Sequence, residues 1–419
     1  MSNSKCAPES DISKKYNDYS LQLSRWFLVP IGAWPQINAS NSIWKILVLL
    51  QILICSSMVA SVTVPCLLHV LFDKVNIKAR LNAIGPLLHR IMGSVNYWVL
   101  LKRSGDIRKL IRHMETDWRL VQRIDDREVM LQHAKYGRSV ALICGLIMQG
   151  GAFLFSLARA MKTVPITVGN ETFTTHPMTC PIYSKIIDTR YSPVNEIALV
   201  LQFLSTFIIN SSTVGACSLA AIFAIHACGQ LNVLYTWLHE LVEKKKENDT
   251  AEGKVAVIVE HHLRILSFIS RVESIMHPVS LTELMGCTVI MCLLGYYTIM
   301  AWETLDTAKI ISYVIVYLSM SFNIFIFCYI GEIITEQCKY VGQMAYMTDW
   351  YNLHHKTALG LVLIIARSNN VIKMTAGKLF HLSIATFGDV SNTDIPFLCF
   401  LTKILINFLY LINNFLIFY

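Results

Sequence analysis

The chain has 419 residues, of which 54% are hydrophobic and only 15% are charged, and its mean hydropathy is +0.48. Soluble domains usually carry about 25% charged residues, so this composition excludes an ordinary water-soluble protein and predicts an all-α protein of the lipid bilayer. The formal net charge of +8 comes from basic residues that flank apolar runs, which indicates loops at a membrane surface and no nucleic-acid partner.

Seven apolar runs are long enough to cross a bilayer, since one helical crossing needs about 20 mostly apolar residues. The second run contains His89 and Arg90, which favour either a water-filled internal pocket or a displaced helix in which Arg90 pairs or reaches the interface. The seventh contains Lys373, Lys378, His381 and Asp389, which is typical of a helix that faces water or other helices. The expected spans cover residues 44–72, 81–101, 139–161, 194–227, 279–302, 310–330 and 372–390.

Lysine and arginine are concentrated in alternate loops. Residues 1–43 and the loops after spans two, four and six are basic, and the loop at 102–138 holds ten Lys and Arg residues. By the positive-inside rule these segments lie in the cytoplasm. The N-terminus is therefore expected inside the cell, opposite to G-protein-coupled receptors. Residues 1–42 lack the compact apolar core of a signal peptide, so the first span is expected to act as its own signal.

The loop between spans three and four is expected on the outer face. It carries the sequon Asn170-Glu171-Thr172, which predicts N-linked glycosylation at Asn170 and agrees with a lumenal loop. Cys66 and Cys180 are expected near the same face, where oxidation is available to them. Most of the 12 cysteines lie inside apolar runs and are interpreted as small packing residues.

The basic loops show helical periodicity. Apolar residues recur at steps of three or four positions with charges between them, so helices are predicted to continue the spans below the membrane. Their apolar faces need a partner, which is either the rest of this chain or another subunit. One pattern consists of Ile107, Leu110, Ile111, Met114, Trp118, Leu120 and Val121, and the other of Leu263, Ile265, Leu266, Phe268, Ile269 and Val272.

No motif for catalysis occurs in the sequence. The zinc-protease, serine-hydrolase, phosphate-binding and dinucleotide-binding patterns are all absent, and there is no CxxC pair. The adjacent pairs at 261–262 and 354–355 are histidines that point about 100° apart on a helix, which makes poor joint metal sites. The sequence therefore predicts no enzyme, no cofactor and no metal centre.

Aromatic and soft side chains gather in the halves of spans three, five and six that the charge rule places outside. A mostly apolar pocket with a few hydroxyl groups suits a small volatile ligand, so these side chains are candidate ligand contacts. Ordinary helix packing and an interfacial aromatic belt are the alternatives for any one of them. The candidates are Met148, Phe155, Tyr296, Tyr297, Tyr313 and Tyr317.

Residues 327–390 carry short motifs in a fixed order. Phe-Cys-Tyr-Ile-Gly-Glu occupies 327–332, Trp-Tyr-Asn-Leu occupies 350–353, and Arg-Ser follows at 367–368. Met-Thr-Ala-Gly-Lys-Leu-Phe at 374–380 precedes Leu-Ser at 382–383 and Thr-Phe at 386–387. This order and spacing resembles the C-terminal region of insect odorant receptors, of the odorant-specific tuning type and not the co-receptor. Over residues 1–326 the resemblance is limited to length, span number, topology and long cytoplasmic loops.

The resemblance implies a ligand-gated, non-selective cation channel. Members work as heterotetramers with the co-receptor Orco in the plasma membrane of olfactory sensory dendrites. The implied parts are a cytoplasmic N-terminal segment at 1–43, spans with an odorant pocket at 44–330, a cytoplasmic anchor segment at 331–371 and a pore-lining seventh helix at 372–390. The candidate pore residues are Ser383, Thr386 and Val390, with Val390 near the outer gate.

After Val390 the sequence departs from the usual ending of that family, which contains Leu, Lys, Thr, Ser and an aromatic stretch. Residues 391–419 are instead rich in Leu, Ile, Phe, Asn and Tyr. We interpret them as an atypical apolar tail, read through from an intron, that forms an eighth crossing or lies along the outer surface.

Three other membrane classes are alternatives. A gustatory receptor is the strongest, but its usual ending of Thr-Tyr, five apolar residues and Gln-Phe is absent. A G-protein-coupled receptor is disfavoured by the inverted orientation and by the absence of Asp-Arg-Tyr and Asn-Pro-x-x-Tyr motifs. A transporter commonly shows internal repeats, and none is evident in this chain.

Overall fold

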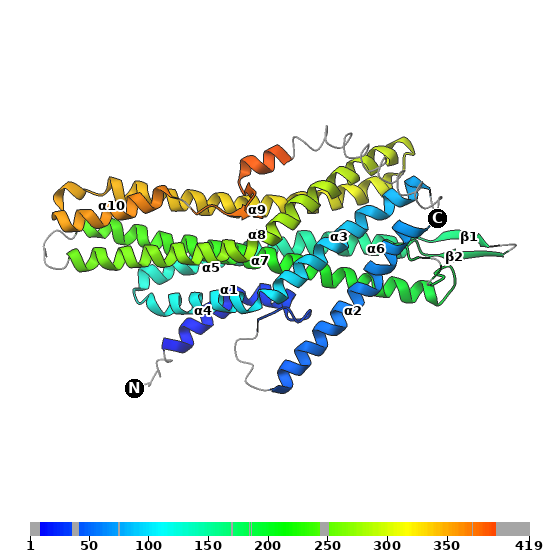
Figure 1. Cartoon of the computed structure of the whole chain (residues 1–419), viewed down its shortest axis with the longest axis horizontal. Coiled ribbons are helices and arrows are strands. Elements are labelled where there is room, and N and C mark those ends of the chain that lie inside the picture. The colour runs from blue at the N-terminus through cyan, green and yellow to red at the C-terminus, as the bar shows by residue number, and fades with distance from the viewer. Residues whose placement is uncertain are drawn as a thin grey trace, which may run out of the picture.

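The computed structural model describes residues 9–35, 42–73, 76–168, 171–183, 185, 187–243, 251–370 and 372–390. Helices make up almost all of the regular structure, joined by two short antiparallel hairpins, so the expected all-α class is confirmed (Figure 1). The helices are α1 Glu9–Leu28, α2 Ser42–Phe72, α3 Ile77–Lys102, α4 Ser104–Leu120, α5 Ile124–Cys144, α6 Gly150–Met161, α7 Val194–Glu243, α8 Ala251–Glu303, α9 Thr307–Met347 and α10 His355–Asn369.

Among the described residues, five helical stretches are long and apolar enough to cross a membrane. They are α2, the continuous helix Ile124–Met161 that contains α5 and α6, and long parts of α7, α8 and α9. They correspond to the expected spans one, three, four, five and six. The second expected span lies in α3, whose 26 residues give a length of about 39 Å but whose polar side chains lower its hydropathy.

Three helices continue far beyond the thickness of a bilayer. α7 has 50 residues, α8 has 53 and α9 has 41. At about 1.5 Å per residue α7 is roughly 75 Å long, more than twice the roughly 30 Å hydrocarbon core. The expected helical extensions are therefore confirmed. In Figure 1 they gather with α10 at one end of the molecule, while the hairpin β1–β2 marks the other.

The extensions bury their apolar faces within the chain. On α4, Ile107, Leu110, Ile111 and Met114 are at most 1% exposed, and Trp118 is also buried. α4 packs against α1, α3 and α8. The matching stripe on α8 is buried as well at Ile265, Leu266, Phe268, Ile269 and Val272, whereas Leu263 and Leu120 are exposed.

The N-terminal segment contributes a helix that the sequence pattern did not predict. α1 packs against α4, α5 and α7 through small polar and leucine side chains. Its Ser24 hydroxyl donates to the Ser218 hydroxyl of α7 at 2.9 Å. Three residues earlier on α7, no Cβ fits at Gly215 because the side chain of Leu28 occupies that space. Small residues on both helices therefore allow a close approach between their backbones.

The expected helix at 372–390 is wrong over its first half. Thr375–Ala376 forms strand β3 and Phe380–His381 forms strand β4, and helix begins only at residue 384. Gly377 and Lys378 both have φ of +62°, which an α-helix excludes. Ser383 then caps the new helix, because its Oγ accepts the backbone N–H of Thr386 at 3.1 Å.

A second hairpin lies between α6 and α7. Strand β1, Val164–Val168, pairs with β2, Glu171–Thr175, in antiparallel register. This hairpin replaces the plain loop expected between spans three and four. The predicted glycosylation site Asn170 and the tail 391–419 lie outside the described residues.

Candidate functional site

A cavity of about 480 Å³ lies near the end of the bundle that carries β1–β2. This volume is within the range of roughly 300–1,000 Å³ that is usual for small-molecule sites. Its walls come from α2, α3, the turn before α6, α6, α7, α8, α9 and the loop before α7. The lining includes Asn82, Gly85, Pro86, His89, Arg90, Met148, Gly151, Ala152, Phe155, Ser156, Met178, Thr179, Pro181, Thr206, Asn210, Ile290, Leu293, Leu294, Tyr297, Tyr313, Val316, Ser319 and Met320.

The structure brings four of the six candidate ligand contacts to this cavity. Met148, Phe155, Tyr297 and Tyr313 line it. Tyr296 and Tyr317 do not line it and instead pack, partly buried, against the hydrophobic core. Tyr317 is one helical turn from Tyr313 on α9. Tyr313 lines the cavity and Tyr317 does not, so substitutions at the two positions can be compared directly.

A π-helical turn shapes one wall of the cavity. Gly145–Gln149 forms this turn, named η1, between α5 and α6. π turns are rare, and they often occur at functional sites. The wider turn holds the Met148 carbonyl where it accepts a hydrogen bond from the Asn210 side chain of α7 at 3.1 Å. Both residues line the cavity, so the irregular turn fixes part of its surface.

Tyrosine rings form the opposite wall. The ring centroids of Tyr297 and Tyr313 lie 5.8 Å apart, which is usual for interacting aromatic side chains. The Tyr297 hydroxyl donates to the Leu81 carbonyl of α3. This hydrogen bond orients the Tyr297 side chain and ties α8 to α3, so the ring contributes mainly apolar surface to the cavity.

Arg90 is both a cavity residue and a structural tie. It is 2% exposed, and its guanidinium donates to the Ser205 hydroxyl at 2.7 Å, the Thr206 hydroxyl at 2.9 Å and the Gln202 carbonyl at 3.3 Å. It also donates to the Cys180 sulfur at 2.9 Å. The sequence suggested either that Arg90 faces an internal pocket or that it is paired. In the structure Arg90 does both, since it lines the cavity and is hydrogen-bonded to α7.

Several lining residues were missed by sequence reasoning. Asn210 and Ser319 come from the middle of apolar runs, and Met178, Thr179 and Pro181 come from a loop. A lone polar residue in an apolar run was the available signal for Asn210 and Ser319. Nothing local in the sequence indicates that the loop folds onto the cavity.

The whole lining combines apolar and aromatic surface with a few polar side chains, of which Arg90, Arg159 and Lys309 are basic. Asn210 and Arg90 are already hydrogen-bonded to the protein. The remaining polar surface is contributed by hydroxyls, amides, the His69 and His89 rings, and the basic side chains of Arg159 and Lys309. Such a site suits a small, largely apolar molecule that makes one or two hydrogen bonds.

A second polar cluster lies among α3, α7, α8 and α9. Glu283 is 2% exposed, and its carboxylate accepts from the side-chain amides of Asn96 and Asn323. The Thr213 hydroxyl also donates to it at 3.3 Å, and the Cys287 thiol donates at 3.5 Å. Neutral donors from four helices thus surround one acid, which links these helices at a single point.

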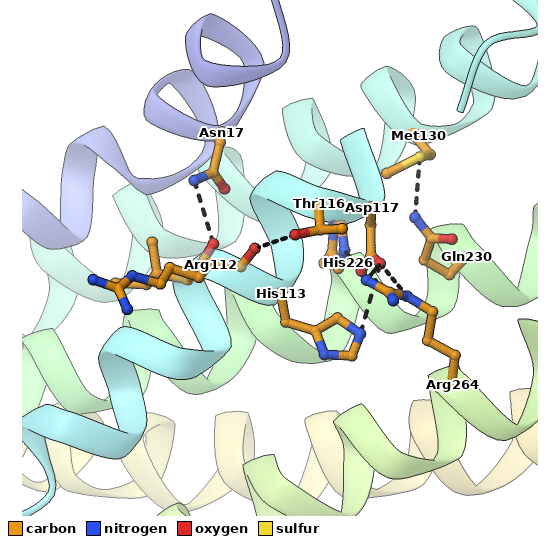
Figure 2. Close-up of polar contacts among 10 residues, drawn as sticks. Asn17, Arg112, His113, Thr116, Asp117, Met130, His226, Gln230 and Arg264 are labelled. Carbon is orange, nitrogen blue, oxygen red and sulfur yellow. Dashed lines mark hydrogen bonds and ion pairs between the residues drawn. The ribbon is translucent and has the colours of Figure 1, made fainter. Parts of the chain in front are cut away.

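The long helices are tied together by a polar network around Asp117 (Figure 2). Asp117 of α4 lies 3.0 Å from His226 Nε2 of α7 and accepts from Arg264 of α8 at 2.8 Å. Burial alone would raise the pKa of Asp117, but the hydrogen bond to His226 and the charges of His226, His113 and Arg264 outweigh it and hold this pKa below its usual value. The carboxylate therefore stays charged and joins three helices.

The candidate pore residues lie around the start of the last described helix. Ser383 is its cap, and Thr386 lies in its first turn. Thr386 and Val390 are four residues apart and so share one helix face. Val390 packs partly buried against the core.

The model of the family described as 7tm Odorant receptor matches residues 76–394. The chain belongs to the odorant receptor family. It is a multi-pass membrane protein of that family, since it also has several helices able to cross a membrane. This agrees with the family suggested by the motifs at 327–390 and with the expectation that the chain is no enzyme.

Curated relatives come from insects. Odorant receptor 13a of Drosophila melanogaster is 22% identical over 228 residues, which are 49% of this chain and 54% of the relative. Odorant receptor 82a of the same species is 26% identical over 215 residues, or 51% of this chain and 54% of the relative. The matched region therefore spans about half the length of these relatives.

A solved structure shares the fold over nearly the whole chain. The insect olfactory receptor OR5 from Machilis hrabei, in complex with eugenol, superposes with a TM-score of 0.72 at 13% identity. The match covers 94% of this chain and 100% of that receptor. The same receptor without a named ligand gives a TM-score of 0.71 at 15% identity.

Proposed function

We propose that this protein is the odorant-binding subunit of a ligand-gated, non-selective cation channel and that the cavity holds the odorant. The observation that carries the proposal is a mostly apolar cavity in a fold whose solved relative is described in complex with eugenol. Met148, Phe155, Tyr297 and Tyr313 are the proposed ligand contacts. Tyr296 and Tyr317 are proposed to support the wall from behind.

The residues from 384 onward are proposed to supply the pore-lining helix. Ser383 fixes its start, and Thr386 and Val390 are proposed to face the ion path. The segment 331–371, with α10, is proposed as the anchor that contacts neighbouring subunits. The partner is proposed to be Orco, in a heterotetramer.

The N-terminus is proposed to lie in the cytoplasm, which places the loop between α6 and α7 outside. The support is the excess of Lys and Arg in the loops that join the α10 end of the bundle, such as residues 102–138. The protein is proposed to work in the plasma membrane of olfactory sensory dendrites.

The test is co-expression with Orco in a cell line while currents are recorded under a panel of small volatile molecules. The expected result is a ligand-evoked cation current that needs both chains and persists when G-protein signalling is blocked. Orco alone and this chain alone are the controls. A correctly assembled surface complex that gives no current with the whole panel, or a current that requires G proteins, contradicts the proposal.

A further inference from the structure

Two cysteines from distant parts of the chain meet in a small buried cluster. Cys66 lies on α2, and Cys180 lies in the loop between β2 and α7. Both have 0% exposure and both are free thiols in this structure. Their side chains are hydrogen-bonded to each other. Val62, Val70, Ala83 and Leu87 complete the cluster, which is separate from the main core.

Cys180 is held in place from several sides. The Gln202 side chain of α7 donates to the Cys180 carbonyl at 2.5 Å, and its oxygen accepts the Cys180 backbone N–H at 3.2 Å. Arg90 Nε donates to the Cys180 sulfur at 2.9 Å. In the folded protein the hydrogen bond from Cys66 and the positive charge of Arg90 lower the pKa of the Cys180 thiol despite its burial.

The loop that carries Cys180 also forms part of the cavity. Met178, Thr179 and Pro181, on either side of Cys180, line the cavity together with Arg90. A covalent bond at Cys180 would therefore fix one wall of the site to α2. Among the residues of α2, His69 alone lines the cavity, so α2 otherwise contributes little to that wall.

We propose that Cys66 and Cys180 form a disulfide in the mature protein, which clamps the cavity loop to α2. The proposal rests on the orientation given above, in which this loop faces the lumen during synthesis. Disulfides form and persist in that compartment. Cys144 and Cys217, whose sulfurs are 3.8 Å apart, lie toward the cytoplasmic ends of the proposed spans 139–161 and 194–227, away from the lumen, and are expected to stay reduced.

The oxidant is a protein disulfide of the lumenal thiol–oxidoreductase class. The Cys180 thiolate attacks one sulfur of that disulfide, which forms a mixed disulfide and releases one oxidoreductase thiolate. The Cys66 thiolate then attacks the Cys180 sulfur and releases the second. Two electrons pass to the oxidoreductase, the two protons leave Cys66 and Cys180, and the oxidoreductase ends as a dithiol. Burial of the pair follows as the loop packs onto α2.

The test uses the full chain, co-expressed with Orco and purified from the monodisperse fraction without reductant. Thiols are alkylated in denaturant with one reagent, the sample is reduced, and newly released thiols are alkylated with a second. Peptide mass spectrometry is expected to find Cys66 and Cys180 carrying the second label in at least about 80% of the molecules. Cys144 and Cys217 are the internal controls and should carry the first.

Connectivity is tested with Cys66→Ser. In this variant Cys180 should move from the second label to the first, and Cys180→Ser should do the same for Cys66. First label at both cysteines in the unmutated protein, or an unchanged second label on the remaining cysteine, overturns the proposal. Because the unmutated protein gives the main readout, poor folding of a variant does not obscure the result.

Orientation is tested separately with Lys185→Cys, an exposed position in the same loop. A membrane-impermeant maleimide should label this variant in intact cells. Absence of labelling would overturn the proposed orientation, whereas labelling together with free Cys66 and Cys180 would overturn only the disulfide.

Discussion

Gly331 of α9 lies against the backbone of Leu382 so closely that no Cβ fits at position 331, because it would overlap the Leu382 carbonyl. One residue later, Glu332 accepts the Ile384 backbone N–H at 3.1 Å. The two motifs at 327–332 and 382–383 therefore meet in space. Together they fix where the hairpin β3–β4 ends and where the last described helix starts.

Gly331→Ala is expected to push Leu382 and the following helix away from α9. Overpacking of this kind costs about 1–3 kcal/mol, and here the obstacle is backbone, which has little freedom to yield. The thermal midpoint of the purified receptor should fall, and so should the ligand-evoked current per surface receptor. Gly105→Ala is the matched control, because nothing lies within 4 Å of a Cβ there. Equal behaviour of the two variants would contradict the close contact.

Arg90→Met should destabilise the protein by about 1–3 kcal/mol, because Ser205, Thr206 and the Gln202 carbonyl lose a buried partner. Arg90→Lys should recover only part of this loss, since an ammonium cannot reproduce the fork of guanidinium donors. Thermal unfolding in detergent measures both. Arg119→Met, which removes an exposed ion pair with Glu115, should change the midpoint little. If Arg90→Met leaves the thermal midpoint unchanged, these hydrogen bonds make no net contribution to stability.

Tyr313→Ala should weaken activation by a fitting odorant roughly 10–200-fold, which corresponds to about 1–3 kcal/mol of lost apolar contact. Tyr317→Ala, one turn away and outside the cavity wall, should shift the half-maximal concentration by less than about threefold. Concentration–response curves with Orco co-expressed give both values. If the two variants shift the curve equally, the cavity is not the odorant site.

His262 should make the protein sensitive to mild acid. Burial, together with the charges of Arg367 and His261, lowers the pKa of His262 to about 4 in the folded protein. In the unfolded chain it returns to about 6.5, so between these values the unfolded state binds more protons. Stability is therefore expected to fall as the pH drops from about 6.5 to 4.

His262→Leu should flatten this decline, while the same change at the exposed His239 should not. Thermal midpoints at pH 7.5, 6, 5 and 4.5 provide the measurement. A pH profile of the His262→Leu variant parallel to that of the unmutated protein would refute the assignment. Any residual decline in that variant is expected to come from His113 and His261, whose pKa values burial also lowers.

Much of the helical frame could be predicted from sequence, because hydropathy and periodicity report which faces avoid water. The stripe of Ile107, Leu110 and Met114 is an example, since its spacing alone places it on one buried face. The start of the last helix could not be predicted that way. The apolar and polar residues at 372–383 fit a helix pattern, but the positive φ of Gly377 and Lys378 depends on contacts with α8.

The cavity could be predicted only in part. Met148, Phe155, Tyr297 and Tyr313 follow from residue type and depth along a span. Tyr296 and Tyr317 have the same residue type and lie within about one helical turn of Tyr297 and Tyr313, yet they do not line the cavity, a difference that residue type and span position do not reveal. The loop at 178–181 reaches the cavity through Gln202 and Arg90, which is a contact across distant parts of the chain that no local pattern encodes.

The π turn at Gly145–Gln149 contains one residue more than regular α-helix would use. Each residue advances a helix by about 100° and 1.5 Å. Tightening this turn to α geometry would therefore rotate all of α6 by roughly 100° relative to α5, and Phe155 and Ser156 would turn out of the cavity together. A shift of one residue in the register of this turn would therefore separate two angular settings of the outer half of the helix. Because Phe155 and Ser156 both line the cavity, the register of this one turn decides which α6 side chains face it.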